Sequence, residues 1–94
     1  MYIIFTTTKK PKEIARKLIV NKYAACVSYY KLNSVYYWDG KLVEDTEYNL
    51  VIKTRRVRRT INYLKQIHDY KLPEILYFRV NASKEYRKWV DENS

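Results

Sequence analysis

A single histidine and a nearby group of carboxylates are the side chains of this chain most suited to binding a metal ion. His68 is the only imidazole, and Glu44, Asp45 and Glu47 lie close together in the sequence. Imidazole suits copper and zinc, whereas carboxylates suit harder cations and can also act in acid–base chemistry. No second histidine or cysteine lies at zinc-motif spacing. The alternatives are a packed His68 and carboxylates that pair with lysines or face water.

Four arginines within the segment Arg55–Arg59 are suited to binding an anion. They begin a helix expected over residues 54–68, where the helix dipole disfavours an exposed cation by about 0.3–1 kcal/mol. Free backbone N–H groups and guanidinium groups both bind phosphate, so Arg55 and Arg56 are predicted to hold a small anion such as phosphate or sulfate weakly. The alternative is a solvated basic surface. The chain has a single glycine and therefore no glycine-rich phosphate loop.

The carboxylates lie on a predicted hairpin that is long for a domain of this size. Strand-like runs over residues 26–38 and 41–53 flank Asp39-Gly40, a pair typical of a two-residue hairpin turn. Each arm of about 13 residues would reach roughly 40 Å. A domain of about 100 residues has a radius of gyration near ~13 Å. Another copy of the same chain is expected to cover the hairpin.

Both faces of this hairpin carry apolar and aromatic side chains. A two-residue turn places Tyr37 opposite Leu42 and fixes the rest of the register. Asn33 and Ser34 interrupt the apolar pattern, which predicts a bulge or bend there. The aromatic tip, Tyr36–Lys41, is expected to pack against a neighbouring subunit; the alternative is a stacking surface for a ligand between subunits.

The remaining sequence predicts two more strands and three helices. The strands are expected over residues 2–6 and 74–80, and the helices over 11–23, over 54–68, and from Asn81 or Ser83 onward. This order predicts one α+β domain over residues 1–94, a ferredoxin-like β-α-β-β-α-β fold with an extra C-terminal helix. Helices on one face of a four-stranded sheet leave the other face free for self-association.

The composition narrows the function classes. A hydrophobic fraction of 47% with 16% aromatic residues excludes a disordered chain. The net charge of +9 suits nucleic acid, an anionic ligand or solubility, but the glycine-containing motif of RNA-binding ferredoxin-like domains is absent, which argues against nucleic acid. No membrane-length apolar run or signal peptide is present, so a cytoplasmic protein is expected. Few glycines and many charged residues favour a thermostable protein.

Several segments together resemble one family, the CutA divalent-cation tolerance proteins. Their order and spacing match over nearly the whole chain, and the most specific are the hairpin tip and the segment after the second helix. The matching segments are Ala24-Ala25-Cys26-Val27, Tyr36-Tyr37-Trp38-Asp39-Gly40-Lys41, Glu44-Asp45, Ile52-Lys53-Thr54, His68-Asp69-Tyr70-Lys71-Leu72-Pro73-Glu74-Ile75 and Tyr86-Arg87-Lys88-Trp89-Val90.

This resemblance implies a non-enzymatic homotrimer whose hairpins wrap neighbouring subunits and which takes part in tolerance to copper and other divalent metal ions. His68 matches the family histidine, and Glu44 or Glu74 would complete a metal site. Some copper-binding members have a cysteine where this chain has Thr6, so a weakly held copper ion is expected. The alternative is a PII-like ligand-binding regulatory or scaffold trimer with a ligand in the cleft between subunits, formed by Tyr37, Trp38, Lys53, Tyr70 and Pro73.

Overall fold

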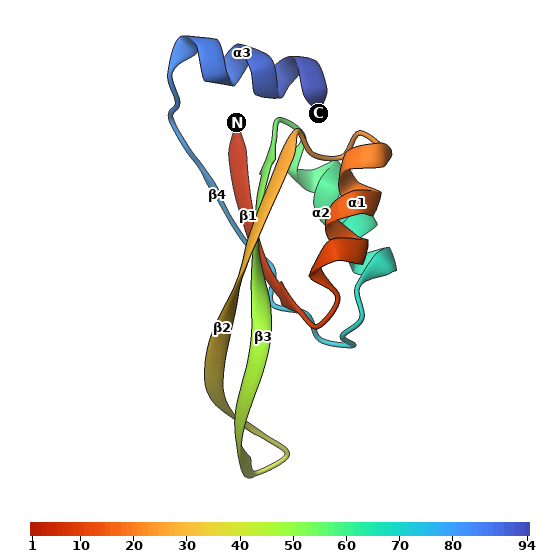
Figure 1. Cartoon of the computed structure of the whole chain (residues 1–94), viewed down its shortest axis with the longest axis vertical. Helices are drawn as coiled ribbons and strands as arrows, with labels where there is room; N and C mark the ends of the chain where they lie inside the picture. The colour runs from red at the N-terminus through yellow and green to blue at the C-terminus, as the bar shows by residue number, and fades with distance from the viewer.

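The structure is a computed structural model that describes all residues from 1 to 94. A four-stranded antiparallel sheet carries two helices on one face, and a third helix lies at the end where the chain terminates (Figure 1). The elements in chain order are β1 (Tyr2–Thr8), α1 (Pro11–Val20), β2 (Cys26–Trp38), β3 (Lys41–Thr54), α2 (Val57–Ile67), β4 (Leu76–Arg79) and α3 (Lys84–Asn93). The strand order β2-β3-β1-β4 is that of the expected ferredoxin-like α+β fold with an added C-terminal helix.

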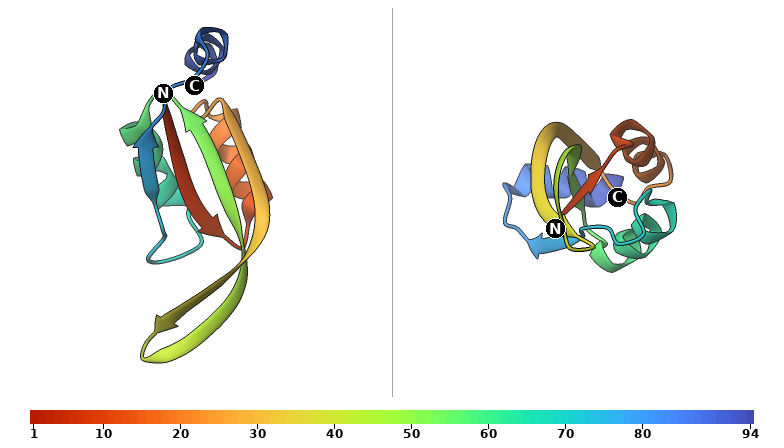
Figure 2. Two further views of the ribbon diagram at one scale, coloured as in Figure 1. Left: turned by 90° about the vertical axis from the view of Figure 1, so that its left-hand side faces the viewer. Right: turned by 90° about the horizontal axis from the view of Figure 1, so that it is seen from below.

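The long hairpin is confirmed, with a turn in which Asp39 has φ of 52° and Gly40 has φ of 74°. Positive φ at both positions is what the Asp-Gly pair predicts. The register runs without interruption from the pair Cys26–Lys53 to the pair Trp38–Lys41. Of the two expected alternatives at Asn33 and Ser34, a bulge or a bend, the bulge is wrong, because these residues pair directly with Thr46 and Asp45. The ribbon instead twists and curves smoothly (Figure 2).

The hydrophobic core lies between the sheet and the two helices on its covered face. Because strand side chains alternate, Ile4 of β1 and its partner Ile52 of β3 point to the same face. Ile14 and Leu18 of α1 are four residues apart and so project together onto this layer. The fully buried members are Ile4, Ile14, Leu18, Ala24, Leu50, Ile52 and Leu64.

The opposite face of the sheet has no helix over it (Figure 2, left). Aromatic side chains on this face are open to solvent, with Tyr30 54% and Phe78 43% exposed. The distal part of the hairpin is also bare, with Val35 63%, Tyr37 74% and Leu42 60% exposed. The hairpin gives the molecule a longest dimension of 46 Å against a radius of gyration of 14.0 Å. One chain therefore leaves a large apolar surface uncovered, as the hairpin length predicts.

Two of the helices differ from their predicted bounds. Helix α1 ends at Val20 and not at Tyr23, because Lys22 has a left-handed φ of 62° that stops the helix. Helix α2 begins at Val57, and Thr54, the expected cap, is the last residue of β3. The Thr54 hydroxyl donates to the Tyr23 carbonyl at 2.8 Å, so it connects the end of β3 to the segment that precedes β2.

The observed bounds of β1, β4 and α3 can also be compared with the predicted ones. Strand β1 runs to Thr8 because β3 continues to pair with it. Strand β4 is confined to Leu76–Arg79, since only these residues pair with β1, its single neighbour in the sheet. The predicted start of α3 at Ser83 is confirmed, because its Oγ accepts the backbone N–H of Tyr86 at 3.3 Å.

Candidate functional site

The C-terminal end of β1, the segment after α2 and the middle of the hairpin converge at one place in the fold. His68 caps the C-terminal end of α2, and its side chain is completely buried. Thr6 and Thr8 alternate along β1 and therefore share the face that α2 covers. Lys9 follows the strand directly and reaches toward the hairpin. Residues more than 30 positions apart in the sequence thus meet in one polar cluster.

Both ring nitrogens of His68 are engaged in hydrogen bonds. Its Nδ1 lies 3.0 Å from the backbone nitrogen of Tyr70 and must accept that N–H. The proton of a neutral ring is then on Nε2, which donates to Thr6 Oγ1 at 2.9 Å. Burial lowers the pKa of His68, and the nearby Asp69 carboxylate only partly opposes this effect. The geometry and the pKa direction both favour a neutral imidazole.

Asp69 ties the segment after α2 to the end of β1. Its carboxylate accepts the Thr8 hydroxyl at 2.5 Å and the Lys9 backbone N–H at 3.1 Å. Burial by itself raises the pKa of Asp69, but these two hydrogen bonds, together with its own backbone N–H and the nearby His68, outweigh burial, so the net pKa is lowered. Asp69 is therefore ionised, and its hydrogen bonds to the end of β1 fix the position of the neighbouring His68.

Two further contacts fasten the hairpin to this cluster. The Lys9 ammonium pairs with the Asp45 carboxylate and also donates to the Thr46 carbonyl at 2.6 Å. The hydrogen bond between Lys9 and Asp45 raises the pKa of Lys9 and lowers the pKa of Asp45. The Tyr70 hydroxyl donates to Glu47 Oε1 at 2.7 Å. Burial is the main cause that raises the pKa of Tyr70, and this hydrogen bond adds to it. The hairpin therefore has a fixed anchor where it leaves the sheet.

The predicted metal ligands occupy separate parts of the chain. Glu44 lies on β3 opposite Val35, within the protruding half of the hairpin. Glu74 lies in the connection before β4, and His68 is buried at the end of α2. The chain contains no group of three or more His, Cys, Asp or Glu side chains arranged to hold a metal ion.

The predicted cleft residues are also spread along the chain. Tyr37 and Trp38 lie at the hairpin tip, whereas Lys53 pairs with Cys26 at the other end and donates to Ser28 Oγ at 2.9 Å. The length of the ribbon separates these groups by roughly 40 Å. Tyr70 and Pro73 do come together, and they line a pocket of about 470 Å³ with Lys65, Lys71, Leu72 and Ile75. A cleft that uses all five predicted residues requires more than one subunit.

The arginine run is partly occupied by contacts within the chain. Arg55 donates its backbone N–H to Ser94 Oγ at 3.2 Å and its Nε to the Ser94 carbonyl at 2.9 Å. Arg59 donates to the Lys22 carbonyl at 3.1 Å and lies 4.1 Å above the ring centroid of Tyr23. Arg56 takes part in no ion pair. Anion binding by Arg55 and Arg56 stays a prediction, with Arg55 already holding the end of α3.

Sequence reasoning missed the three residues at the C-terminal end of β1 and directly after it that organise the site. Thr6, Thr8 and Lys9 carry no metal-binding or catalytic pattern, and only the run of threonines at the end of an apolar strand distinguishes them. Hydroxyls at alternate positions would share one face, and a buried hydroxyl requires a partner. Their partners, His68 and Asp69, could not be assigned from this signal.

A four-stranded antiparallel sheet in the order β2-β3-β1-β4, with two helices on one face and a protruding β2–β3 hairpin, defines a PII-like α+β protein. The family model for "CutA1 divalent ion tolerance protein" matches residues 1–93. The chain belongs to this family. None of its helices combines the length and apolar character needed to cross a membrane.

Similar proteins that carry the family name support this family assignment. The divalent-cation tolerance protein CutA of Thermotoga maritima is 32% identical over 96 residues, which is 99% of this chain and 95% of the relative. The CutA homologues of Danio rerio and Xenopus laevis are 34% and 37% identical over 92% and 97% of this chain. The chain spans only 60% and 63% of the length of these two vertebrate proteins.

Solved structures give the same answer for the fold. CutA1 from Pyrococcus horikoshii has a TM-score of 0.95 at 27% identity, with 100% of this chain and 98% of that chain covered. The PII-like protein CutA from Nostoc in its apo form has a TM-score of 0.92 at 29% identity, covering 99% and 96%. A protein from Archaeoglobus fulgidus described as periplasmic divalent cation tolerance protein CutA has a TM-score of 0.92 at 30% identity, covering 99% and 98%.

Proposed function

We propose that this chain forms a homotrimer that binds copper or another divalent metal ion and acts in the cellular response to such ions. The observation that carries this proposal is the family match over residues 1–93, together with named relatives that are divalent-cation tolerance proteins. We expect no catalysed reaction, because the hydroxyl beside His68, that of Thr6, is fully buried and out of reach of a substrate. A cytoplasmic location is part of the proposal, although the relative from Archaeoglobus fulgidus is described as periplasmic.

The self-association in this proposal is supported by the uncovered surface. The bare face of the sheet and both sides of the distal hairpin expose aromatic and aliphatic side chains. Exposed apolar patches beyond a few hundred Å² are uncommon on monomers and mark interaction sites. A closed ring of three copies would let each hairpin lie across a neighbour, and burial contributes about 25 cal/mol per Å² of apolar surface.

His68 is the proposed metal ligand in each chain, with Glu44 or Glu74, from the same or a neighbouring subunit, as its partner. Coordination would require His68 to exchange its hydrogen bond to Thr6 or the one from Tyr70. We expect copper binding in the micromolar range or weaker, because this exchange opposes it and none of the proposed ligands is a soft thiolate. Affinity should fall as the pH drops and the imidazole is protonated.

Isothermal titration with copper sulfate, compared between the parent and His68→Gln, tests this assignment. Glu44→Gln and Glu74→Gln identify the carboxylate partner, and Glu85→Gln, which removes a charge from the exposed start of α3, is the matched control. Loss of copper binding in His68→Gln with no change in the control supports the site. Equal affinity in the parent and His68→Gln means that His68 serves only the packing of α2.

A second candidate function is favoured by the pocket that Tyr70 and Pro73 line. This pocket of about 470 Å³ also contains Lys65 and Lys71, and it has the size of a small-molecule site. In a PII-like trimer, the hairpin tip of a neighbouring subunit would complete it. A regulatory ligand with anionic groups would suit its two lysines.

Crystals soaked with pyrophosphate test this second candidate directly. We expect density beside Lys71 and Tyr70, with the tip of another subunit in contact. A Lys71→Gln crystal treated in the same way should show the site empty. If pyrophosphate density is absent from the parent at high soaking concentration, the ligand-binding alternative loses its support.

A further inference from the structure

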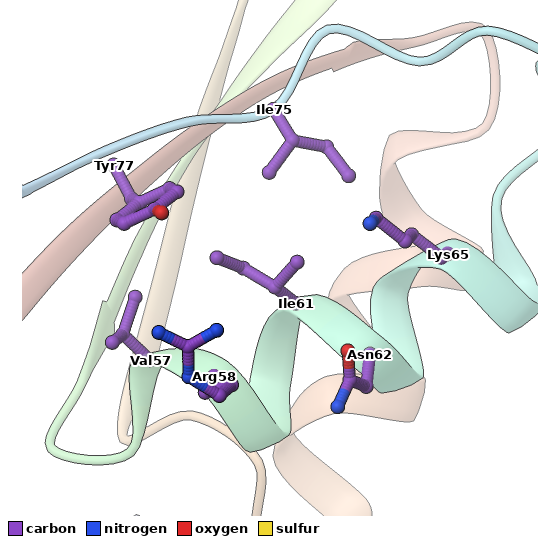
Figure 3. A pocket seen from close by; sticks show the side chains of 7 residues that line it. All are labelled: Val57, Arg58, Ile61, Asn62, Lys65, Ile75 and Tyr77. Carbon is purple, nitrogen blue, oxygen red and sulfur yellow. The ribbon is translucent and has the colours of Figure 1, made fainter.

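A small pocket lies between α2 and β4 on the face of the sheet that carries the helices (Figure 3). Its volume is about 210 Å³. The lining residues are Val57, Arg58, Ile61, Asn62 and Lys65 from α2, and Ile75 and Tyr77 from the β4 segment. None of these seven residues is a proposed metal ligand or part of the Arg55 and Arg56 site, but Lys65 and Ile75 also line the neighbouring pocket of Tyr70 and Pro73.

The fold explains why the pocket has an apolar floor. Val57 and Ile61 are one helical turn apart and face β4, where they pack against the edge of the core. Tyr77 pairs with Ile4 in the sheet and so points to the same covered face. Strand β4 is the edge of the sheet and has only four residues, so the apolar side chains between it and α2 stay partly open.

The charges around this floor are all positive. Arg58 and Lys65 stand at opposite ends of the pocket with Ile61 between them (Figure 3). They are seven positions apart in the sequence, which is about 10.5 Å along a helix axis. Neither side chain takes part in an ion pair, and no carboxylate lines the pocket or occurs anywhere in α2.

We propose that this pocket binds a small amphiphilic anion, a carboxylate or sulfonate attached to an aromatic or short alkyl body. The apolar body would lie on Ile61, Ile75 and Tyr77, and the anionic group would pair with Arg58 or Lys65. The volume is below the ~300–1,000 Å³ of pockets for drug-sized ligands, which limits the body to about one or two rings. The proposal requires neither metal binding nor the anion site of Arg55 and Arg56.

Titration of the assembled full-length protein with naphthalene-2-sulfonate, followed by calorimetry and by amide chemical shifts, tests the proposal. We expect saturable binding with the largest shifts at Ile61 and Tyr77. The uncharged 2-naphthol and inorganic sulfate should each bind much more weakly, because one lacks the anion and the other the apolar body.

Charge-removing variants separate the pocket from general attraction to a basic protein. The double variant Arg58→Gln, Lys65→Gln should weaken naphthalene-2-sulfonate binding by about tenfold or more. The double variant Lys12→Gln, Arg16→Gln removes two exposed charges from α1 and should leave the affinity unchanged. Glutamine is a good helix former, so all four substitutions are compatible with folding.

Four results would overturn the proposal. Equal affinity in the two double variants would assign the binding to overall charge, and equal binding of 2-naphthol would assign it to an apolar surface alone. Sulfate shifting the same amides as strongly would leave only a simple anion site. Absence of binding by the native assembly, with the Tyr77 amide protected from exchange, would mean that a neighbouring copy of the chain covers the pocket.

Discussion

The double variant Val35→Lys, Leu42→Lys should convert the assembled protein into monomers of 11.5 kDa or aggregates of unfolded chain. In a single chain both side chains are more than half exposed, so a lysine there would meet water and cost little. In the proposed trimer the same positions lie against a neighbouring subunit. Two uncompensated charges buried there would each cost several kcal/mol.

Sedimentation equilibrium at micromolar concentration measures this effect. Val20→Lys is the matched control, because Val20 is 72% exposed at the end of α1 and lies outside the hairpin. A lysine at a helix C-terminus also suits the dipole, so the control should keep the mass of the parent. A parent protein that sediments as a stable monomer would refute the assembly, and an unchanged mass in the double variant would place the interface elsewhere.

Acidification between pH 7 and pH 5 should destabilise the protein, and His68→Gln should remove most of this pH dependence. Burial lowers the pKa of His68 in the folded protein below its unfolded value near ~6.5. The unfolded state therefore takes up the proton first as the pH falls. The contribution of His68 is fully present above about pH 6.5 and is lost progressively down to its folded pKa.

The size of the effect follows from the size of the pKa shift. Each unit of pKa lowering costs about 1.4 kcal/mol once the pH is below both values, or roughly 6–11 °C in Tm for a domain of this length. Protonated Nδ1 would become a donor directed at the Tyr70 N–H, and the Asp69 carboxylate and the backbone of Thr7 would only partly offset that conflict. We expect protonation of His68 to cost more free energy than its attraction to Asp69 returns, because the Asp69 carboxylate already accepts hydrogen bonds from Thr8 and Lys9.

Urea unfolding at a fixed protein concentration in chelator-treated buffer, repeated across this pH range, measures the effect. The pKa values of Asp45 and Asp69 are also lowered, but their contributions are lost only as the pH falls below the ordinary carboxyl range near ~3.9. The range from pH 7 to pH 5 therefore isolates His68. Parallel curves for the parent and His68→Gln would mean that the folded and unfolded pKa values are equal.

Local sequence patterns were enough to predict the helices and strands of this protein and the order in which the strands pair. Asp39-Gly40 fixed the turn, and the turn fixed the whole register of the hairpin, because a two-residue loop allows only one alignment of its strands. Ser83 marked the start of α3 through a contact with Tyr86 three residues away. The excess length of the hairpin also predicted that one chain would leave apolar surface bare. These features depend on short sequence separations or on periodicity.

The tertiary structure decided the state of the site. Thr6 and His68 are 62 residues apart, and Thr8 and Asp69 are 61 apart, so no local pattern could pair them. Whether His68 is an open ligand or a buried, doubly hydrogen-bonded side chain depends on which groups the fold places at its two nitrogens. The pocket beside β4 likewise exists only because α2 crosses a short edge strand. Periodicity predicts which face of an element is buried, but only packing selects the partner that a polar group finds there.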